Sequence, residues 1–278
     1  MKKSIVFYFI ILIALVPFST VFAADDDKSD LTWETFHINL GYYIANLDSS
    51  FRLGGSGLGV ELDVEEFLGM DTNDTSFRID AGYRFGQTRR HKMNFSWFGF
   101  HRDATTSIIQ GITLPDGTPL PIGTTVNSIF EFDIIKLTYN YSLIFDDRIN
   151  LYLGGGLYIM PLTVGLGPAG AERTEEDITA PLPVGSLGVD LALTPKWFLR
   201  QRIDLFYLDI GNYRGGIMDS SIALEYYAWK HVALGLALDG LRVFVEAEDE
   251  TDFPGIEDFV GSVDFTYWGT QLYVKFYF

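Results

Sequence analysis

Alternation between apolar and polar residues over many short stretches is the feature that most constrains how this chain folds. In one stretch, apolar positions alternate with polar or small ones, as Phe77, Ile79, Ala81, Tyr83 and Phe85 do with Arg78, Asp80, Gly82 and Arg84. Similar stretches occupy residues 135–145 and 232–239. Because successive side chains of a β-strand point to opposite faces, a period of two indicates strands with one apolar and one polar face. The polar faces are also rich in Gly, Ala and Ser, as expected inside a narrow barrel.

Ten such segments are predicted, and the links between them alternate in length. The predicted strands span residues 33–47, 76–86, 91–105, 128–145, 149–162, 182–194, 197–209, 218–229, 231–245 and 262–278. Tight links at 87–90, 146–148, 195–196 and 230 alternate with mostly long ones across 48–75, 106–127, 163–181, 210–217 and 246–261. Transmembrane barrels have short turns at one end and longer loops at the other, whereas a soluble β-sandwich has no reason to segregate them. We therefore predict an all-β, transmembrane antiparallel up-and-down β-barrel of about ten strands. Eight or twelve strands remain as alternatives, since residues 48–75 have room for a hairpin.

The N-terminus has the organisation of a signal peptide. Lys2 and Lys3 precede an apolar stretch over residues 4–18, and Ala23 ends a small-residue cleavage site. A retained anchor is the alternative, but Pro17 interrupts the stretch and acidic residues follow it. Beyond residue 23 no run of about 18 apolar residues occurs, so helical membrane spans are excluded. We predict a signal peptide over 1–23 and one barrel domain over 24–278.

Composition excludes several classes of function. The chain has no cysteine, which excludes a lipoprotein anchor, disulfides and thiol catalysis. Without Lys2 and Lys3 it has 18 basic and 37 acidic residues, a formal charge of −19. Nucleic-acid binding depends on a basic surface, so we expect no nucleic-acid partner.

The last ten residues carry a motif. Gly269 begins the segment, and Leu272, Val274, Phe276 and Phe278 occupy alternate positions up to the end of the sequence. This segment resembles the insertion signal of the bacterial outer-membrane β-barrel family. The resemblance implies an outer-membrane location in contact with lipids, recognition by the barrel-assembly machinery, and closure of the last strand against the first. We expect a monomer, and no functional subfamily is indicated.

The strand ends beside the tight turns have their own composition. Aromatic residues, which favour the membrane surface, gather there: Trp33, Tyr83, Phe85, Phe145, Trp197, Tyr226, Trp229, Phe276 and Phe278. The same turns carry basic residues, namely Arg89, Arg90, Lys92, Lys196 and Lys230. Both termini are predicted at this end, which the barrel prediction assigns to the periplasm.

Charged residues with inward parity form the candidate site. A lower layer is predicted to hold Asp80, Asp190, Arg200, Arg202, Glu225 and Lys275, and a higher group to hold Arg78, Lys136, Asp204 and Asp239. Unpaired charges are unfavourable in a narrow lumen, so opposite signs should pair. In particular, Arg200 and Arg202 are predicted to lie between Asp190 and Glu225. This network is read either as a structural plug or as a constriction that selects small solutes.

Little points to catalysis or to a cofactor. His91 and His231 fall in tight turns and His37 points inward, which leaves His101, with Asp103 two residues on, as a weak candidate pair. The loops are acidic, and residues 246–258 carry Glu246, Glu248, Asp249, Glu250, Asp252, Glu257 and Asp258 without a basic residue. Such loops suit divalent cations, but no twelve-residue calcium loop is present, and a solvated surface is the first interpretation. No catalytic residue, metal site or cofactor is predicted.

Three functions follow from these observations. The first is a non-enzymatic envelope protein that is structural or binds through its acidic outer loops. The second is a narrow passive channel for small solutes or ions. The third is a hydrolase that uses the outer rim of the barrel.

Overall fold

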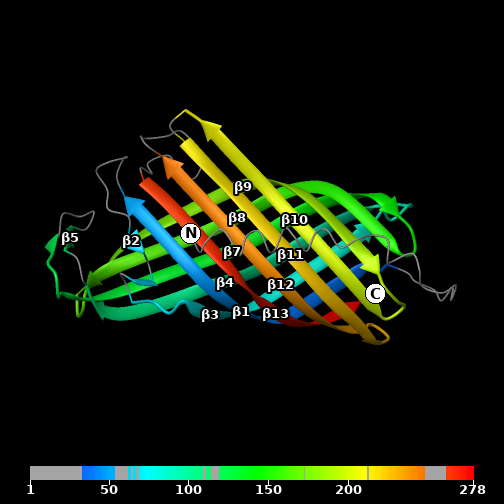
Figure 1. Ribbon diagram of the computed structural model, residues 1–278, viewed down its shortest axis with the longest axis horizontal. Coiled ribbons are helices and arrows are strands. Elements are labelled where there is room, and N and C mark those ends of the chain that lie inside the picture. Colours follow the sequence, from blue (N-terminus) through cyan, green and yellow to red (C-terminus); the bar gives the residue numbers. More distant parts are fainter. Residues whose placement is uncertain are drawn as a thin grey trace.

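Ten long strands form one closed ring in which every strand is antiparallel to both neighbours (Figure 1). The computed structural model describes residues 33–53, 62–63, 65–66, 69–108, 111–113, 119–171, 173–211, 213–247 and 261–278. The strands are β1 (Phe36–Leu53), β3 (Asn73–Phe85), β4 (His91–Ser107), β7 (Thr125–Phe145), β8 (Ile149–Pro168), β9 (Thr174–Ala192), β10 (Trp197–Ile210), β11 (Tyr213–Trp229), β12 (Val232–Ala247) and β13 (Gly261–Tyr277). Two-residue strands in the connections are β2 (Leu62–Asp63), β5 (Ile112–Thr113) and β6 (Pro119–Leu120). The predicted all-β antiparallel barrel of ten strands is confirmed.

The first and last strands close the ring, and they lie side by side in Figure 1. Residues 37–53 of β1 pair in register with residues 261–277 of β13. Beyond this ladder the Phe278 amide donates to Phe36 O at 2.9 Å, and Phe278 O accepts from the Thr35 amide at 2.7 Å. Every strand of the ring therefore has a partner on each side, so none of the ten strands is an edge strand.

The two ends of the barrel differ in their connections: one has only short turns, and the other has the long loops. At the short-turn end the links are residues 86–90, 146–148, 193–196 and 230–231, and at the long-loop end they are 54–72, 108–124, 169–173, 211–212 and 248–260. All five links at the long-loop end are shorter than predicted, and two of them are reduced to a few residues, because β8 and β9 extend through most of 163–181 and β11 begins at Tyr213. Glu175, Asp177 and Thr179 are exposed on the extended part of β9, so its outer face is polar there and lacks the apolar positions that predict a membrane strand.

Side chains alternate between an apolar exterior and a buried lumen. On β1, Tyr42 and Ile44 point outward and are 54% and 50% exposed, whereas Tyr43 and Ala45 between them are 0% and 1% exposed. The described residues contain no helix that is both long and apolar enough to cross a membrane. Since the exterior is apolar, the core of this protein is the lumen, and the candidate site lies within it.

Candidate functional site in the lumen

The chain enters the barrel through its short-turn mouth. The first strand begins at Phe36 rather than at residue 33 as predicted, and the residues before it turn into the lumen. Trp33 is buried, donates its indole N–H to Asp146 O at 2.6 Å and packs edge-on against Phe198 with ring centroids 5.7 Å apart. Trp33 O accepts a hydrogen bond from the Arg89 guanidinium. The segment 33–35 thus covers the mouth, and it places the Glu34 carboxylate inside the barrel.

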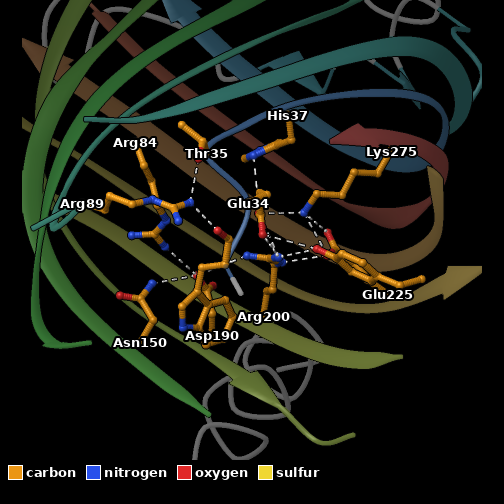
Figure 2. Close-up of polar contacts among 12 residues, drawn as sticks. Glu34, Thr35, His37, Arg84, Arg89, Asn150, Asp190, Arg200, Glu225 and Lys275 are labelled. Carbon is orange, nitrogen blue, oxygen red and sulfur yellow. Dashed lines mark hydrogen bonds and ion pairs between the residues drawn. The ribbon is translucent and has the colours of Figure 1, made fainter. Parts of the chain in front are cut away.

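Arg200 of β10 is the centre of a mouth cluster, which we define as Glu34, Arg84, Asp190, Arg200, Glu225 and Lys275 (Figure 2). Its guanidinium lies 2.9 Å from Glu34, 3.2 Å from Asp190 and 2.8 Å from Glu225. Tyr227 accepts a further hydrogen bond from it at 2.9 Å. One cation thus joins the N-terminal segment to the walls of β9 and β11.

Lys275 of β13 is the second cation of the mouth cluster. Its ammonium donates to Glu34 at 3.0 Å and to Glu225 at 2.9 Å, and its side chain is 1% exposed. Tyr273 also donates to Glu225, at 2.9 Å. Burial alone would raise the pKa of the Glu34 carboxyl, but the positive charges of Arg200 and Lys275 outweigh burial and hold this pKa well below its ordinary value. Glu34 is therefore ionised at neutral pH, and its ion pairs with Arg200 and Lys275 hold the N-terminal segment inside the mouth.

Arg84 closes the opposite side of the mouth (Figure 2). It lies 3.6 Å from Asp190 and donates to Ser142 at 3.3 Å, and its guanidinium stacks over the Phe145 ring at 4.9 Å. Asn150 donates a hydrogen bond to the same Asp190 at 2.8 Å. The carboxylate of Asp190 therefore has partners on β3, β8 and β10.

A second polar group, the mid-lumen cluster, lies further into the barrel. It consists of Arg78, Asp80, Lys136, Tyr158, Arg202, Asp204, Asp219 and Asp239. Arg78 lies 3.0 Å from Asp80 and 3.3 Å from Asp239. Lys136 pairs with Asp219, and Arg202 lies 3.1 Å from Asp204. These contacts join side chains from β3, β7, β10, β11 and β12 across the lumen.

An aromatic core fills the lumen above the mid-lumen cluster. Tyr43, Phe98, Phe100 and Tyr267 are each 0% or 1% exposed, and neighbouring ring centroids lie 5.6–6.1 Å apart. Lys136 holds its ammonium 5.0 Å from the Phe98 ring, which is a cation–π contact between the two layers. The lumen is thus filled by side chains over this part of its length.

Loop residues cover the aromatic core at the long-loop end. Met70, Ile108 and Leu120 are all buried and belong to the same apolar cluster as the rings. Beside them, Arg102 of β4 forms a buried ion pair with Glu65 at 2.6 Å and donates to Ser49 at 3.2 Å. Described residues of two long connections therefore pack onto the aromatic core at the second end of the lumen.

The structure places all ten predicted lumen residues inside the barrel, but it divides them differently. Asp190, Arg200, Glu225 and Lys275 belong to the mouth cluster. Asp80 and Arg202, predicted in the same layer, belong to the mid-lumen cluster with Arg78, Lys136, Asp204 and Asp239. Arg200 lies between Asp190 and Glu225 as predicted, whereas Arg202 turns away from both and contacts Asp204, because the lumen has two levels of charge at this point.

Sequence reasoning missed several charged residues of the lumen, among them Arg84, Asp219 and Glu34. Arg84 and Asp219 have the same strand parity as their charged neighbours Arg78 and Glu225, so the alternation contained the signal for both. Glu34 had no such signal. Its parity in an extended strand would place it outside, and it reaches the lumen because the chain leaves strand geometry before Phe36.

The C-terminal strand presents the residues of the predicted insertion motif on two faces. Leu272 and Phe276 are exposed on the exterior with Phe278, whereas Val274 on the same face is partly covered. Gly269 faces inward, and a Cβ at this position would lie 2.2 Å from Ile44 O. Glycine therefore permits the close approach of β13 to β1.

The histidines form no catalytic arrangement with the predicted partner. His101 lies on the exterior near the long-loop end, and its Nε2 is 3.7 Å from Asp133 on β7 rather than paired with Asp103. Within the described ranges, no three His, Asp or Glu side chains are grouped closely enough to hold a metal ion. The signal peptide and most of the acidic segment 246–258 lie outside the described residues.

Comparison with known proteins identifies the fold. No protein-family model and no curated protein sequence matches the chain. Among solved structures, the outer membrane protease OmpT from Escherichia coli is similar with a TM-score of 0.57 and 10% identity, over 89% of this chain and 100% of that one. The Yersinia pestis attachment invasion locus protein Ail matches with a TM-score of 0.38 and 8% identity, over 87% and 99% of the two chains. OprG from Pseudomonas aeruginosa matches with a TM-score of 0.38 and 11% identity, over 89% and 98%. The chain therefore has the antiparallel barrel fold of bacterial outer-membrane proteins.

Proposed function

We propose that this chain is an outer-membrane barrel with a closed lumen, and that it serves the cell envelope as a structural or binding protein through its long-loop end. The observation that carries the proposal is the filled lumen. Large side chains that a channel would hydrate are fully buried there, including Arg84, Lys136, Tyr158 and Lys275. Opposite charges at both levels are paired, as stable burial of ions requires.

The exterior supports the membrane location. Leu234, Leu236 and Leu238 of β12 are 45–50% exposed, a pattern that suits lipid and is unfavourable in water. Trp197 and Trp229 lie on the exterior at the short-turn end, where amphipathic rings favour a membrane surface. The short-turn end would face the periplasm, and assembly would depend on the barrel-assembly machinery reading the last strand.

Contacts outside the cell would be made by the long connections. Their acidic composition suits solvated binding surfaces, and divalent cations are candidate partners of the carboxylates. Outer-membrane lipids would surround the belt, and the ring, complete within one chain, is consistent with a monomer. Catalysis forms no part of this proposal, and a survey of lipid and peptide cleavage by the purified barrel would test the hydrolase alternative.

Solute uptake by proteoliposomes tests the closed lumen. Folded protein would be reconstituted, and its insertion checked by heat-modifiable migration in gels. We expect swelling in isotonic arabinose or glycine at the rate of protein-free liposomes, because the aromatic core leaves no path for solutes. Swelling that increases with the amount of protein and decreases with solute size would instead establish the channel alternative.

A further inference from the structure

On the exterior of the barrel, His91 lies among aromatic rings at the short-turn end. Phe85, Tyr139 and Tyr141 contact its ring, with ring centroids 5.2–6.1 Å apart. Tyr139 and Tyr141 are 40% and 39% exposed, and amphipathic rings of this kind favour the surface of a membrane. Arg90 precedes His91 in the chain, so a guanidinium and an imidazole adjoin the lipid-facing belt at this point.

The orientation of the His91 ring is fixed. Its Nδ1 lies 2.7 Å from the Tyr139 hydroxyl. When the hydroxyl donates to Nδ1, the proton of the imidazole resides on Nε2, which is then a hydrogen-bond donor. The Nε2 edge of the ring faces Gly86 of the turn, where a Cβ would lie 3.0 Å from Cδ2 and 3.7 Å from Nε2. Glycine at this position therefore leaves the Nε2 edge uncovered.

Arg90 is held by an irregularity at the end of β7. The register between β7 and β8 shifts between Ser142 and Ile144, and such a bulge leaves backbone groups without ladder partners. Arg90 Nη1 donates to Ser142 O and to Leu143 O, each at 3.0 Å. These contacts occupy Nη1 and leave Nε and Nη2 for another acceptor. Within the described ranges Arg90 forms no ion pair.

The charges of the neighbouring turn do not pair with Arg90. Asp146 Oδ1 accepts hydrogen bonds from the backbone amides of Arg148 and Ile149 at 2.9 and 2.7 Å, which closes the turn 146–148. The turns 86–90 and 146–148 together carry Arg89, Arg90 and Arg148 against Asp146 and Asp147, which leaves one positive charge in excess. This local balance suits a ligand with a single negative charge.

We propose that Arg90 and His91 bind the phosphodiester of a phospholipid headgroup, in the membrane leaflet at the short-turn end. The proposal rests on the membrane location proposed above. Arg90 donates through Nε and Nη2, in the bidentate geometry that a guanidinium forms with phosphate, and His91 donates through Nε2. Tyr141 and Leu143, which are 39% and 51% exposed beside these groups, contact the acyl chains. Free phosphate lacks acyl chains and gains nothing from this apolar surface, so the ligand is a lipid.

Native mass spectrometry of the folded barrel in detergent measures bound lipid directly. The protein would be titrated with phosphatidylglycerol and, in parallel, with a diacyl glycolipid that has no phosphate. We expect one phosphatidylglycerol to bind saturably, with an affinity at least about 10-fold higher than that of the glycolipid. Equal affinities would overturn the proposal, since apolar contacts alone would then explain binding. Millimolar inorganic phosphate should leave the lipid bound, and displacement by it would show a site for free anions instead.

Two variants assign the lipid to these residues. Arg90→Gln should weaken phosphatidylglycerol binding about 10-fold, because it removes a charged hydrogen-bond donor. Lys196→Gln is the matched control, since Lys196 is also basic and lies beside an exposed aromatic residue, Trp197, and it should bind like the wild type. An Arg90→Gln barrel with unchanged affinity would contradict the assignment. If this variant does not fold, as judged by heat-modifiable migration, His91→Phe decides, because Phe retains the ring contacts but has no Nε2.

The acidic residues near the start of the mature chain are the alternative occupant. Changing Asp25, Asp26 and Asp27 together to Asn should leave the affinity for phosphatidylglycerol unchanged. A gain as large as the loss in Arg90→Gln would show that this segment, rather than a lipid, occupies the site. These results are separate from the closed lumen: a conducting barrel that binds phosphatidylglycerol selectively refutes the proposed function alone, and a closed barrel without this selectivity refutes the lipid site alone.

Discussion

Replacement of Arg200 by Met should destabilise the barrel more than any matched change on its surface. Methionine keeps much of the length of the side chain but removes the charge shared by Glu34, Asp190 and Glu225. Breaking a buried ion pair typically costs about 3–5 kcal/mol. Lys275 would still bind Glu34 and Glu225, so we expect a loss near the lower end, about 3 kcal/mol.

Arg214→Met is the matched control. Arg214 also forms an ion pair, with Glu246 at 2.7 Å, but its side chain is 52% exposed. Solvent screens exposed pairs, so this variant should unfold at nearly the same urea concentration as the wild type. Both variants would be compared by urea unfolding in lipid vesicles, with the heat-modifiable gel band as the measure of folded protein.

A double variant tests whether the loss comes from an orphaned charge. Arg200→Met with Glu34→Gln removes one charge of each sign from the mouth cluster. Its loss of stability should therefore be smaller than the sum of the two single losses. If Arg200→Met proved no more destabilising than Arg214→Met, the mouth cluster would be hydrated and the argument for a closed lumen would be refuted.

Three further predictions follow from the same contacts. Deletion of Phe278, whose backbone closes the ring against Phe36, should reduce outer-membrane levels in fractionated cells far more than deletion of a residue within 248–258, and equal levels would disprove the role of the last strand. Trp33→Ala should lower the free energy of unfolding by about 3–5 kcal/mol, since it removes a buried indole and its bond to Asp146, and an unchanged urea midpoint would show that the segment does not cover the mouth. Because the pKa of Glu34 is held well below its ordinary 4.5, its stabilisation is complete above that pH and is lost as the pH falls through the lower folded value. Wild-type stability should therefore drop in acid more steeply than that of Glu34→Gln, and parallel pH profiles would contradict this role.

Strand positions were predictable because lipid and lumen impose opposite demands on alternate residues. Tyr42 and Tyr43 are chemically identical neighbours, yet one is 54% exposed and the other is fully buried. A period of two reveals such pairs from sequence alone. The same parity placed Asp190, Arg200 and Glu225 inside, where the structure brings them into contact.

Strand parity did not predict the positions of the residues that precede β1. Trp33 and Glu34 turn into the mouth, and their partners Asp146 and Lys275 are 113 and 241 residues away in the sequence. No local pattern reports contacts of this kind. The sequence also assigned Lys92 to a basic turn, whereas the structure places it in the lumen wall. An error of one residue in the predicted start of a strand is enough to cause this difference.

Ionic conductance in planar bilayers tests the closed lumen most directly, because ions pass through constrictions that exclude larger solutes. Refolded protein would be added under conditions in which an open barrel control inserts and conducts. The mouth cluster, the mid-lumen cluster and the aromatic core together predict no stepwise conductance at moderate voltage in 1 M KCl, although the barrel is recovered folded from the bilayer lipid. Reproducible unitary conductance steps that persist in preparations of the folded chain would contradict the account.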